Sequence, residues 1–127
     1  MKTLTIKQPW ASLIIEGYKK YEFRGWKTNY RGKILIHAGL SLEKDKERFK
    51  EYNLEYKLGY IIGEAEIVDC ILVDKEFNES LRKINPLVYN RSNHVETYAW
   101  KLENIKKYDD PIPCKGKLGL WNYEGEI

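Results

Sequence analysis

Three charged side chains lie close together between Gly17 and Trp26 of the sequence: Lys19, Glu22 and Arg24. Arg24 carries a planar guanidinium that can grip a phosphate or the edge of a base. Lys19 offers a point charge or, if desolvated, a nucleophile or base, and Glu22 can orient either cation. If the fold brings the three groups to one rim, they form a binding or catalytic site. On an exposed strand, Glu22 and Arg24 would form only a surface ion pair.

Aromatic residues border this charged segment. Trp10 precedes it and Trp26 ends it, in a chain with ten Tyr and four Trp. Such rings stack on nucleobases, although most aromatic residues pack in the core because each buries a large apolar area. Pro9 would fix the backbone beside Trp10, and Arg31 or Arg24 could meet a phosphate while a base lies against a ring. The sequence predicts a core position and a cleft position for Trp10 equally, whereas it favours a cleft position for Trp26.

A short helix and a strand must position these groups. Residues 3–7 alternate like a strand, and a helix then opens at Pro9 and ends at Gly17, because proline suits the first turn and glycine the left-handed cap. Alternation over residues 20–24 predicts a strand with charged residues facing outward and aromatic residues facing inward. The outward set is Lys20, Glu22 and Arg24, and the inward set is Tyr21 and Phe23.

The middle of the chain predicts two more strands around a charged helix. Residues 33–38 form a nearly continuous apolar run, which is typical of a central strand, and His37 within it is interpreted as a core histidine. A helix is predicted over residues 42–52, with the preceding serine as its N-cap. Residues 60–70 predict a long strand in which Gly63 marks a bulge.

The last third predicts a short helix over residues 77–84, a polar loop over residues 85–93 and a strand over residues 98–105. Pro111–Pro113 should break the chain before a final strand over residues 117–123. A length of 127 residues suits one domain. The sequence thus predicts a single α+β domain over residues 1–127, a small, partly open β-barrel of five or six strands with two or three inserted helices.

Composition narrows the functional classes. Lys and Arg number 22 against 19 Asp and Glu, a net charge of only +3, so a local patch must carry any nucleic-acid binding. Cys70 and Cys114 show no C-x-x-C spacing and no leader-like segment is visible, which favours a reduced, cytoplasmic setting. With His37 and His94 as the only histidines, the sequence offers no zinc ligand set, and no apolar run is long enough to span a membrane. We expect no metal, cofactor or membrane partner.

Six motifs in order along the chain resemble the ASCH domain family. They are Gln8-Pro9-Trp10-Ala11-Ser12-Leu13, Gly17-x-Lys19-x-x-Glu22-x-Arg24, Tyr30-Arg31-Gly32, Gly63-x-Ala65-Glu66-Ile67-Val68-Asp69-Cys70, Tyr98-Ala99-Trp100 and Lys115-Gly116-Lys117-x-Gly119-Leu120-Trp121. The resemblance covers nearly the whole chain and implies a PUA-like β-barrel with a cleft beside the first helix. It points to the coactivator-type branch (activating signal cointegrator homology), whose members are thought to bind nucleic acid.

The leading hypothesis is therefore a module that recognises RNA, DNA or a nucleotide without altering it. RNA is the favoured ligand, and the cleft would be lined by the G-x-K-x-x-E-x-R segment. The candidate binding residues are Pro9, Trp10, Lys19, Glu22, Arg24, Trp26 and Arg31.

An enzyme remains the alternative, with Lys19 and Glu22 as candidate catalytic residues. The resemblance includes small bacterial amidohydrolases that remove the acetyl group from N4-acetylcytidine with a Lys, a Thr and a Glu. The Lys matches Lys19, but the Thr position holds Glu22, and a carboxylate cannot take over a hydroxyl's attack on an amide. The remaining Glu could be Glu64, Glu66 or Glu76. A ribonuclease, also proposed in the family, would use Lys19 and nearby tyrosines.

Overall fold

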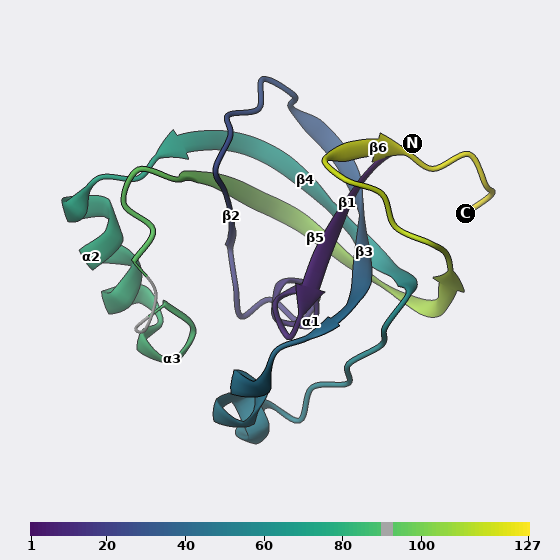
Figure 1. Cartoon of the computed structure of the whole chain (residues 1–127), viewed down its shortest axis with the longest axis horizontal. Helices are drawn as coiled ribbons and strands as arrows, with labels where there is room; N and C mark the ends of the chain where they lie inside the picture. The colour runs from purple at the N-terminus through teal and green to yellow at the C-terminus, as the bar shows by residue number, and fades with distance from the viewer. Residues whose placement is uncertain (90–92) are drawn as a thin grey trace.

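Six strands form one mixed sheet in the computed structural model, which describes residues 1–89 and 93–127 (Figure 1). The strand order is β2-β5-β4-β3-β1-β6. The elements in chain order are β1 (Lys2–Gln8), α1 (Trp10–Ile15), β2 (Tyr21–Arg24), β3 (Gly32–Leu42), the 3-10 helix η1 (Lys44–Tyr52), β4 (Tyr60–Leu72), α2 (Lys75–Ile84), α3 (Pro86–Tyr89), β5 (Tyr98–Pro113) and β6 (Leu120–Asn122).

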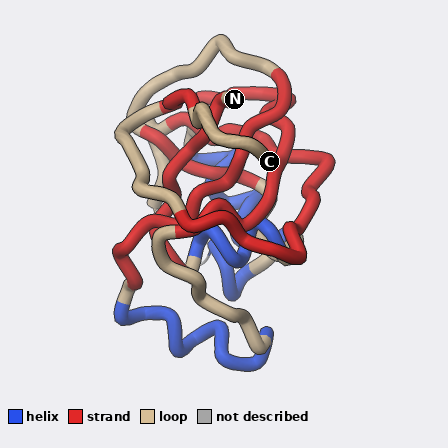
Figure 2. Tube along the Cα trace, turned by 90° about the vertical axis from the view of Figure 1, so that its right-hand side faces the viewer, coloured by secondary structure: helices blue, strands red, loops and turns tan. Residues whose placement is uncertain are grey.

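The sheet curls into a barrel that stays open on one side. β1 pairs parallel with β3, and the other neighbouring strands pair antiparallel. Three strands separate β2 from β1 in the sheet order, yet the Arg24 side chain of β2 donates a hydrogen bond to the Thr5 carbonyl of β1. The curved sheet is visible in Figure 1 and, from the side, in Figure 2. The predicted α+β class and partly open barrel are confirmed, and the open seam lies between β1 and β2.

Two apolar clusters hold the domain together. The larger one lies between α1 and the sheet, and includes Leu4 and Ile6 of β1 with Trp100 and Leu102 of β5. The second cluster joins α1 to the peripheral helices through Leu13, Phe49, Leu81, Val88 and Tyr89. Because α1 contributes to both clusters, the position of the chain that follows it is fixed from two sides.

Gly63 is required because the backbone of β5 and the side chain of Ile15 approach β4 closely there. The pairing of β4 with β5 shifts register between Ile61 and Gly63, as the predicted bulge requires. A Cβ atom at Gly63 would lie 2.4 Å from the Lys106 carbonyl oxygen and 2.7 Å from Ile15 Cδ1, so no larger residue fits without displacing backbone.

Three predicted boundaries are wrong. The helix predicted over residues 42–52 is instead the 3-10 helix Lys44–Tyr52, and no side chain caps its N-terminus. It begins later than predicted because β3 extends to Leu42. The strand β5 also continues through Pro111–Pro113. β2 pairs only with Tyr98–Lys101, so among the described residues the later part of β5 is paired on its β4 side alone, where Ile112 and Pro113 lie opposite Ile61 and Tyr60. A strand with one free side tolerates proline. The last strand covers only Leu120–Asn122, after Gly119 at a φ of +67°.

The predicted polar loop over residues 85–93 is partly helical, since α3 spans Pro86–Tyr89. The remainder of that prediction, residues 90–92, lies outside the described residues. Among the described residues, no helix is long and apolar enough to cross a membrane.

Candidate nucleic-acid site

A cavity of about 610 Å³ opens at the seam between β1 and β2. The first strand contributes Thr5, Ile6 and Lys7, and α1 contributes Trp10. The second strand contributes Glu22, Phe23 and Arg24, and Lys19 lies just before it. The remaining walls come from the end of β3 and the residue after it, from α3 and the segment after it, and from the loop before β6. In that order their lining residues are Gly39, Leu40, Ser41 and Glu43, then Val88, Tyr89 and His94, and then Lys117, Leu118 and Gly119.

Lys19, Glu22 and Arg24 form a continuous chain of charges in this cavity. Lys19 Nζ lies 3.1 Å from Glu22 Oε1 and also donates to the Tyr21 carbonyl. Arg24 Nη2 lies 2.9 Å from Glu22 Oε2 and 2.8 Å from the Thr5 carbonyl oxygen. The carboxylate of Glu22 therefore holds both cations, and Arg24 ties β2 to β1 across the seam.

Lys19 and Glu22 are buried and Arg24 is half-buried, contrary to the outward face predicted for Glu22 and Arg24, whereas Lys20 is exposed as predicted. Lys19 and Glu22 are 5% and 8% exposed. The prediction failed because the curled sheet turns the Glu22 face of β2 toward β1, while Tyr21 and Phe23 pack on Phe77 and Tyr89 of the helices. Both faces of this short edge strand are thus covered. Alternation alone identifies two faces but does not say what covers them.

Burial changes the proton affinity of Lys19. Removal of the ammonium from water lowers the pKa of Lys19, and the neighbouring Glu22 opposes this shift while the Arg24 charge adds to it. One carboxylate faces two cations here, so the cluster carries one net positive charge when all three groups are ionised. Such a cluster attracts an anionic ligand and holds a lysine that releases its proton more readily than usual.

Aromatic rings form the wall beside the charges. The ring of His94 stacks on that of Phe23 at 3.6 Å with an interplanar angle of 3°, and Lys19 Nζ lies 4.9 Å from the Phe23 centroid. Burial and then the positive charge of Lys19 lower the pKa of His94 to about 4, so this imidazole is neutral at pH 7. The buried hydroxyl of Tyr89 accepts the Lys20 N–H, and burial raises the pKa of Tyr89 to about 12. The wall therefore offers neutral rings for stacking.

The structure brings four of the predicted binding residues to the cavity, namely Trp10, Lys19, Glu22 and Arg24. Trp10 serves both predicted roles, because it lines the cavity and also packs against both apolar clusters. The two catalytic candidates, Lys19 and Glu22, are in direct contact.

Pro9, Trp26 and Arg31 are not among the described residues that line the cavity. Pro9 is buried and acts as the N-cap of α1. Trp26 is 41% exposed, and its ring meets Trp100 edge to face at 4.7 Å. Arg31 donates to the Thr28 and Tyr30 carbonyls and faces Asp69 at 4.0 Å. These residues follow or precede the charged segment in sequence, but the chain turns away from the cavity after Arg24.

Several cavity residues escaped sequence reasoning. Thr5 and Lys7 belong to the neighbouring edge of the seam, and Tyr89, His94 and Lys117 come from distant parts of the chain. Only the tertiary packing of strands, helix α3 and loops brings them together, and no local pattern encodes that. His37 is a core histidine, as predicted: it is buried, with Nε2 2.6 Å from the Cys114 carbonyl oxygen and Nδ1 3.2 Å from Thr5 Oγ1. Within residues 1–89 and 93–127 no cluster of three His, Cys, Asp or Glu side chains could hold a metal ion.

The chain belongs to the ASCH domain family, because the model of that domain matches residues 4–112. Two curated relatives are activating signal cointegrator 1 of Homo sapiens and of Mus musculus. Each is 26% identical over 137 residues, which covers 98% of this chain and 22% of the relative. The chain thus spans about a fifth of the length of these relatives, and the similarity supports the coactivator-type branch of the family.

Solved structures agree on the fold. A crystal structure of ASCH from Zymomonas mobilis matches with a TM-score of 0.55 at 16% identity, covering 88% of this chain and 72% of that one. A point variant of the same protein gives 0.52 at 15% identity, covering 88% and 74%. The fold is the PUA-like arrangement expected from the sequence.

Proposed function

We propose that the cavity between β1 and β2 binds one base-bearing unit of a nucleic acid, RNA in the first place, without altering it. The observation that carries this proposal is the Lys19–Glu22–Arg24 chain of charges, with Lys19 and Glu22 buried, beside the stacked rings of Phe23 and His94. The volume of about 610 Å³ falls in the range of small-molecule sites, roughly 300–1,000 Å³. The similarity to activating signal cointegrator 1 supports the proposal, because the resemblance to the coactivator-type branch implies nucleic-acid binding.

The cluster can recognise both parts of a nucleotide. Each oxygen of Glu22 accepts one hydrogen bond from a cation, and a carboxylate oxygen has a second lone pair that can accept from a base N–H. Both hydrogen bonds of Arg24 come from Nη2, so among the described residues its Nη1 donors are open to a phosphate or a base edge. Phe23, His94 and Trp10 supply aromatic surface for the base itself.

A pair of arginine variants tests this proposal. Arg24 lines the cavity and Arg31 does not, although both follow the same helix and both were candidates from the sequence. Arg24→Gln should weaken binding of a short single-stranded RNA by roughly 10- to 100-fold, the effect of one charge-assisted hydrogen bond. Arg31→Gln should change it little. A fluorescence anisotropy titration measures both, and equal affinity of the two variants would contradict the cavity as the site.

A hydrolase is the second candidate, and the state of Lys19 favours it. A lysine that is buried in a cavity and whose pKa burial lowers loses its proton more readily, and a neutral amine can act as a base or nucleophile. Glu22 occupies the position that holds the Thr of the N4-acetylcytidine amidohydrolases, which argues against their mechanism. Incubation with N4-acetylcytidine and with labelled RNA, followed by chromatography, decides the matter. Product formation that Lys19→Ala abolishes would establish an enzyme, and intact substrates would support the recognition module.

A reduced, cytoplasmic setting is part of the same proposal. Cys70 and Cys114 are both free thiols in the structure, as expected for a protein in a reducing compartment. Fractionation of cells expressing a tagged chain tests this assignment directly.

A further inference from the structure

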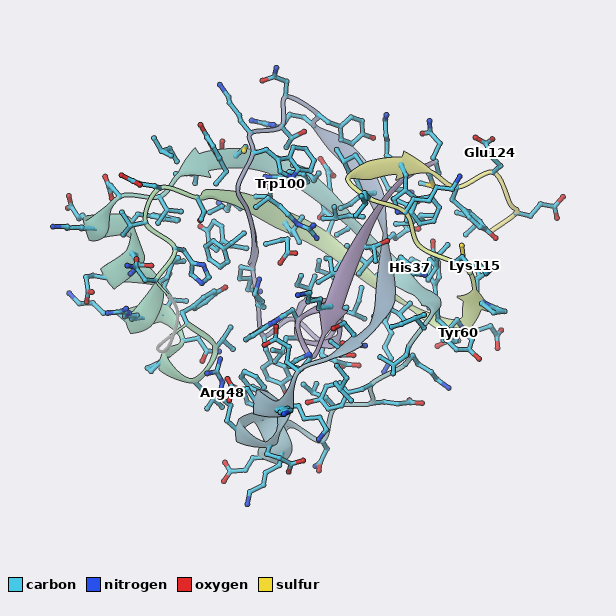
Figure 3. The ribbon with its side chains drawn as sticks, in the orientation of Figure 1. His37, Arg48, Tyr60, Trp100, Lys115 and Glu124 are labelled. Atoms are coloured by element: carbon cyan, nitrogen blue, oxygen red, sulfur yellow. The ribbon has the colours of Figure 1, made fainter. Side chains whose placement is uncertain are left out.

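A second cavity of about 930 Å³ adjoins the first. The two cavities share five lining residues: Thr5, Gly39, Leu40, Lys117 and Leu118. His37, Tyr60 and Lys115 line the second cavity alone, and Figure 3 shows these three on the same side of the barrel, beside the loop that leads to β6. A ligand in the first cavity can therefore continue into the second without leaving the protein surface.

Two exposed leucines mark the boundary between the cavities. Leu40 is 80% exposed and Leu118 is 98% exposed. Leu40 comes from an irregular part of β3, where the pairing with β1 jumps from Ile6–Ala38 to Gln8–Leu42. Leu118 lies in the loop between β5 and β6. Bare apolar side chains beside a cavity are typical of a surface that is covered by a ligand.

The charge of the second cavity suits a polyanion. Its described lining residues include Lys115 and Lys117 and no carboxylate, whereas the first cavity contains Glu22 and Glu43. Both lysines are exposed. Tyr60 adds an aromatic ring to the lining. Cations next to an aromatic ring are the combination with which proteins hold a single nucleic-acid strand.

The loop that carries these lysines is held in place rather than free. His37 Nε2 must donate to the Cys114 carbonyl, so His37 Nδ1 accepts from Thr5 Oγ1, which in turn accepts from Trp121 Nε1 at 3.1 Å. Gly116 fits tightly on this network, because a Cβ atom there would lie 2.7 Å from Thr5 Oγ1 and 2.8 Å from His37 Cε1. The backbone that carries Lys115 and Lys117 is thus held at Cys114 and Gly116 before any ligand arrives, which favours binding.

We propose that the second cavity holds the neighbouring nucleotide of the same single strand, with Lys115 and Lys117 on its phosphates and Tyr60 beside its base. This inference rests on the function proposed for the first cavity. It predicts that affinity depends on chain length: a strand of two or more nucleotides fills both cavities, whereas a mononucleotide fills only the first.

The experiment compares ligands of different length on three proteins. The four 5′-mononucleotides and the matching homodinucleotides and homotetranucleotides are titrated by calorimetry into wild type, Lys115→Gln and Lys83→Gln. Lys115 lines the second cavity alone, and Lys83 is an exposed lysine on α2 that serves as the charge-matched control. We expect the wild type to bind the longer ligands more tightly than the mononucleotides.

Lys115→Gln should lower the affinity for the longer ligands about two- to fivefold and leave the mononucleotides unchanged. It should also reduce the slope of log affinity against log salt by about 0.7, the contribution of one phosphate contact to a single strand. Lys83→Gln should behave as the wild type does.

Other results overturn the proposal in distinguishable ways. Equal affinity for all lengths, with Lys115→Gln unchanged, removes the second subsite and leaves the first cavity as the binding site. No binding at any length removes both proposals. A wild-type dimer in light scattering that Leu118→Ser converts to a monomer would show that a second copy of the chain covers this surface, which also overturns the inference.

Discussion

Two carboxylates of the domain hold lysines at nearly the same distance, yet their surroundings differ. In the cavity, Glu22 lies 3.1 Å from Lys19 and also binds Arg24. On β4, Glu64 lies 3.2 Å from Lys33, whose side chain is 56% exposed, and accepts a hydrogen bond from Tyr108 at 2.6 Å. The geometry of the two ion pairs is almost equal, but only the first has its cation shut off from water.

The pKa shifts follow this difference. Burial lowers the pKa of Lys19, so the shift in the cavity falls on the cation. In the other cluster the Tyr108 hydrogen bond, and then Lys33, lower the pKa of Glu64 against the opposing effect of burial, while burial and the Glu64 hydrogen bond raise the pKa of Tyr108. The comparison teaches that a buried cation, rather than the ion pair as such, distinguishes a candidate site from a structural contact.

The largest expected effect separates the two carboxylates in stability. Glu22→Gln leaves the charges of Lys19 and Arg24 beside each other without an anion, which should reduce the free energy of unfolding by about 3 kcal/mol. Glu64→Gln should cost only about 1 kcal/mol, because Lys33 is exposed and an amide oxygen can still accept from Tyr108. Denaturation by urea at pH 7 measures both.

Lys19→Met is the matched control for this pair. It removes the buried cation together with its charge and leaves Glu22 paired with Arg24, so it should destabilise less than Glu22→Gln. If Glu22→Gln and Glu64→Gln lost the same stability, the distinction between the two clusters would fail.

A smaller effect should appear at acid pH. The pKa of His94 is about 4 in the folded protein against 6.5 for an ordinary histidine. Between these two pH values the unfolded chain therefore binds a proton at His94 that the folded protein does not bind. Stability from this group is complete above pH 6.5 and is lost as the pH falls toward 4. His94→Phe keeps a ring on Phe23 and removes the titration. The unfolding free energies of wild type and variant are compared from pH 7 to pH 4. As the pH falls, the wild type should lose stability relative to the variant. A difference that stays constant with pH would contradict the lowered pKa of His94.

The smallest effect concerns Tyr108. Tyr108→Phe removes its hydrogen bond to Glu64, which should cost about 1 kcal/mol of stability and raise the pKa of Glu64 toward its usual value. RNA affinity should stay the same, because Tyr108 lies outside the described lining of both proposed subsites. Denaturation and an RNA titration check the two halves, and a loss of affinity would show that the outer cluster takes part in binding.

Local patterns predicted much of the fold. The strand over residues 3–7, the helix between Pro9 and Gly17, the bulge at Gly63 and the strand over residues 98–105 all exist, because alternation, helix caps and glycine requirements act over a few residues. The failures at residues 42–52 and at Pro111–Pro113 share one cause. Each depends on how far a neighbouring strand extends, which no local pattern contains.

The candidate site was predictable only in its first part. The spacing of Lys19, Glu22 and Arg24 correctly indicated one convergent cluster. Their burial could not be read from alternation, since the barrel turns this face of β2 toward β1. Trp26 was predicted to line the cleft but lies against Trp100 instead. His94 and Lys117 reach the cavity from distant parts of the chain, which local spacing does not encode.

The most direct test of the cavity maps the amide chemical shifts of the isotopically labelled protein during titration with a short single-stranded RNA. The account predicts that the largest shifts fall on residues 5–7 and 19–24, on both sides of the seam, with the Trp26–Arg31 turn little affected. Shifts confined to Trp26–Arg31, with the Lys19–Glu22–Arg24 chain undisturbed, would contradict it.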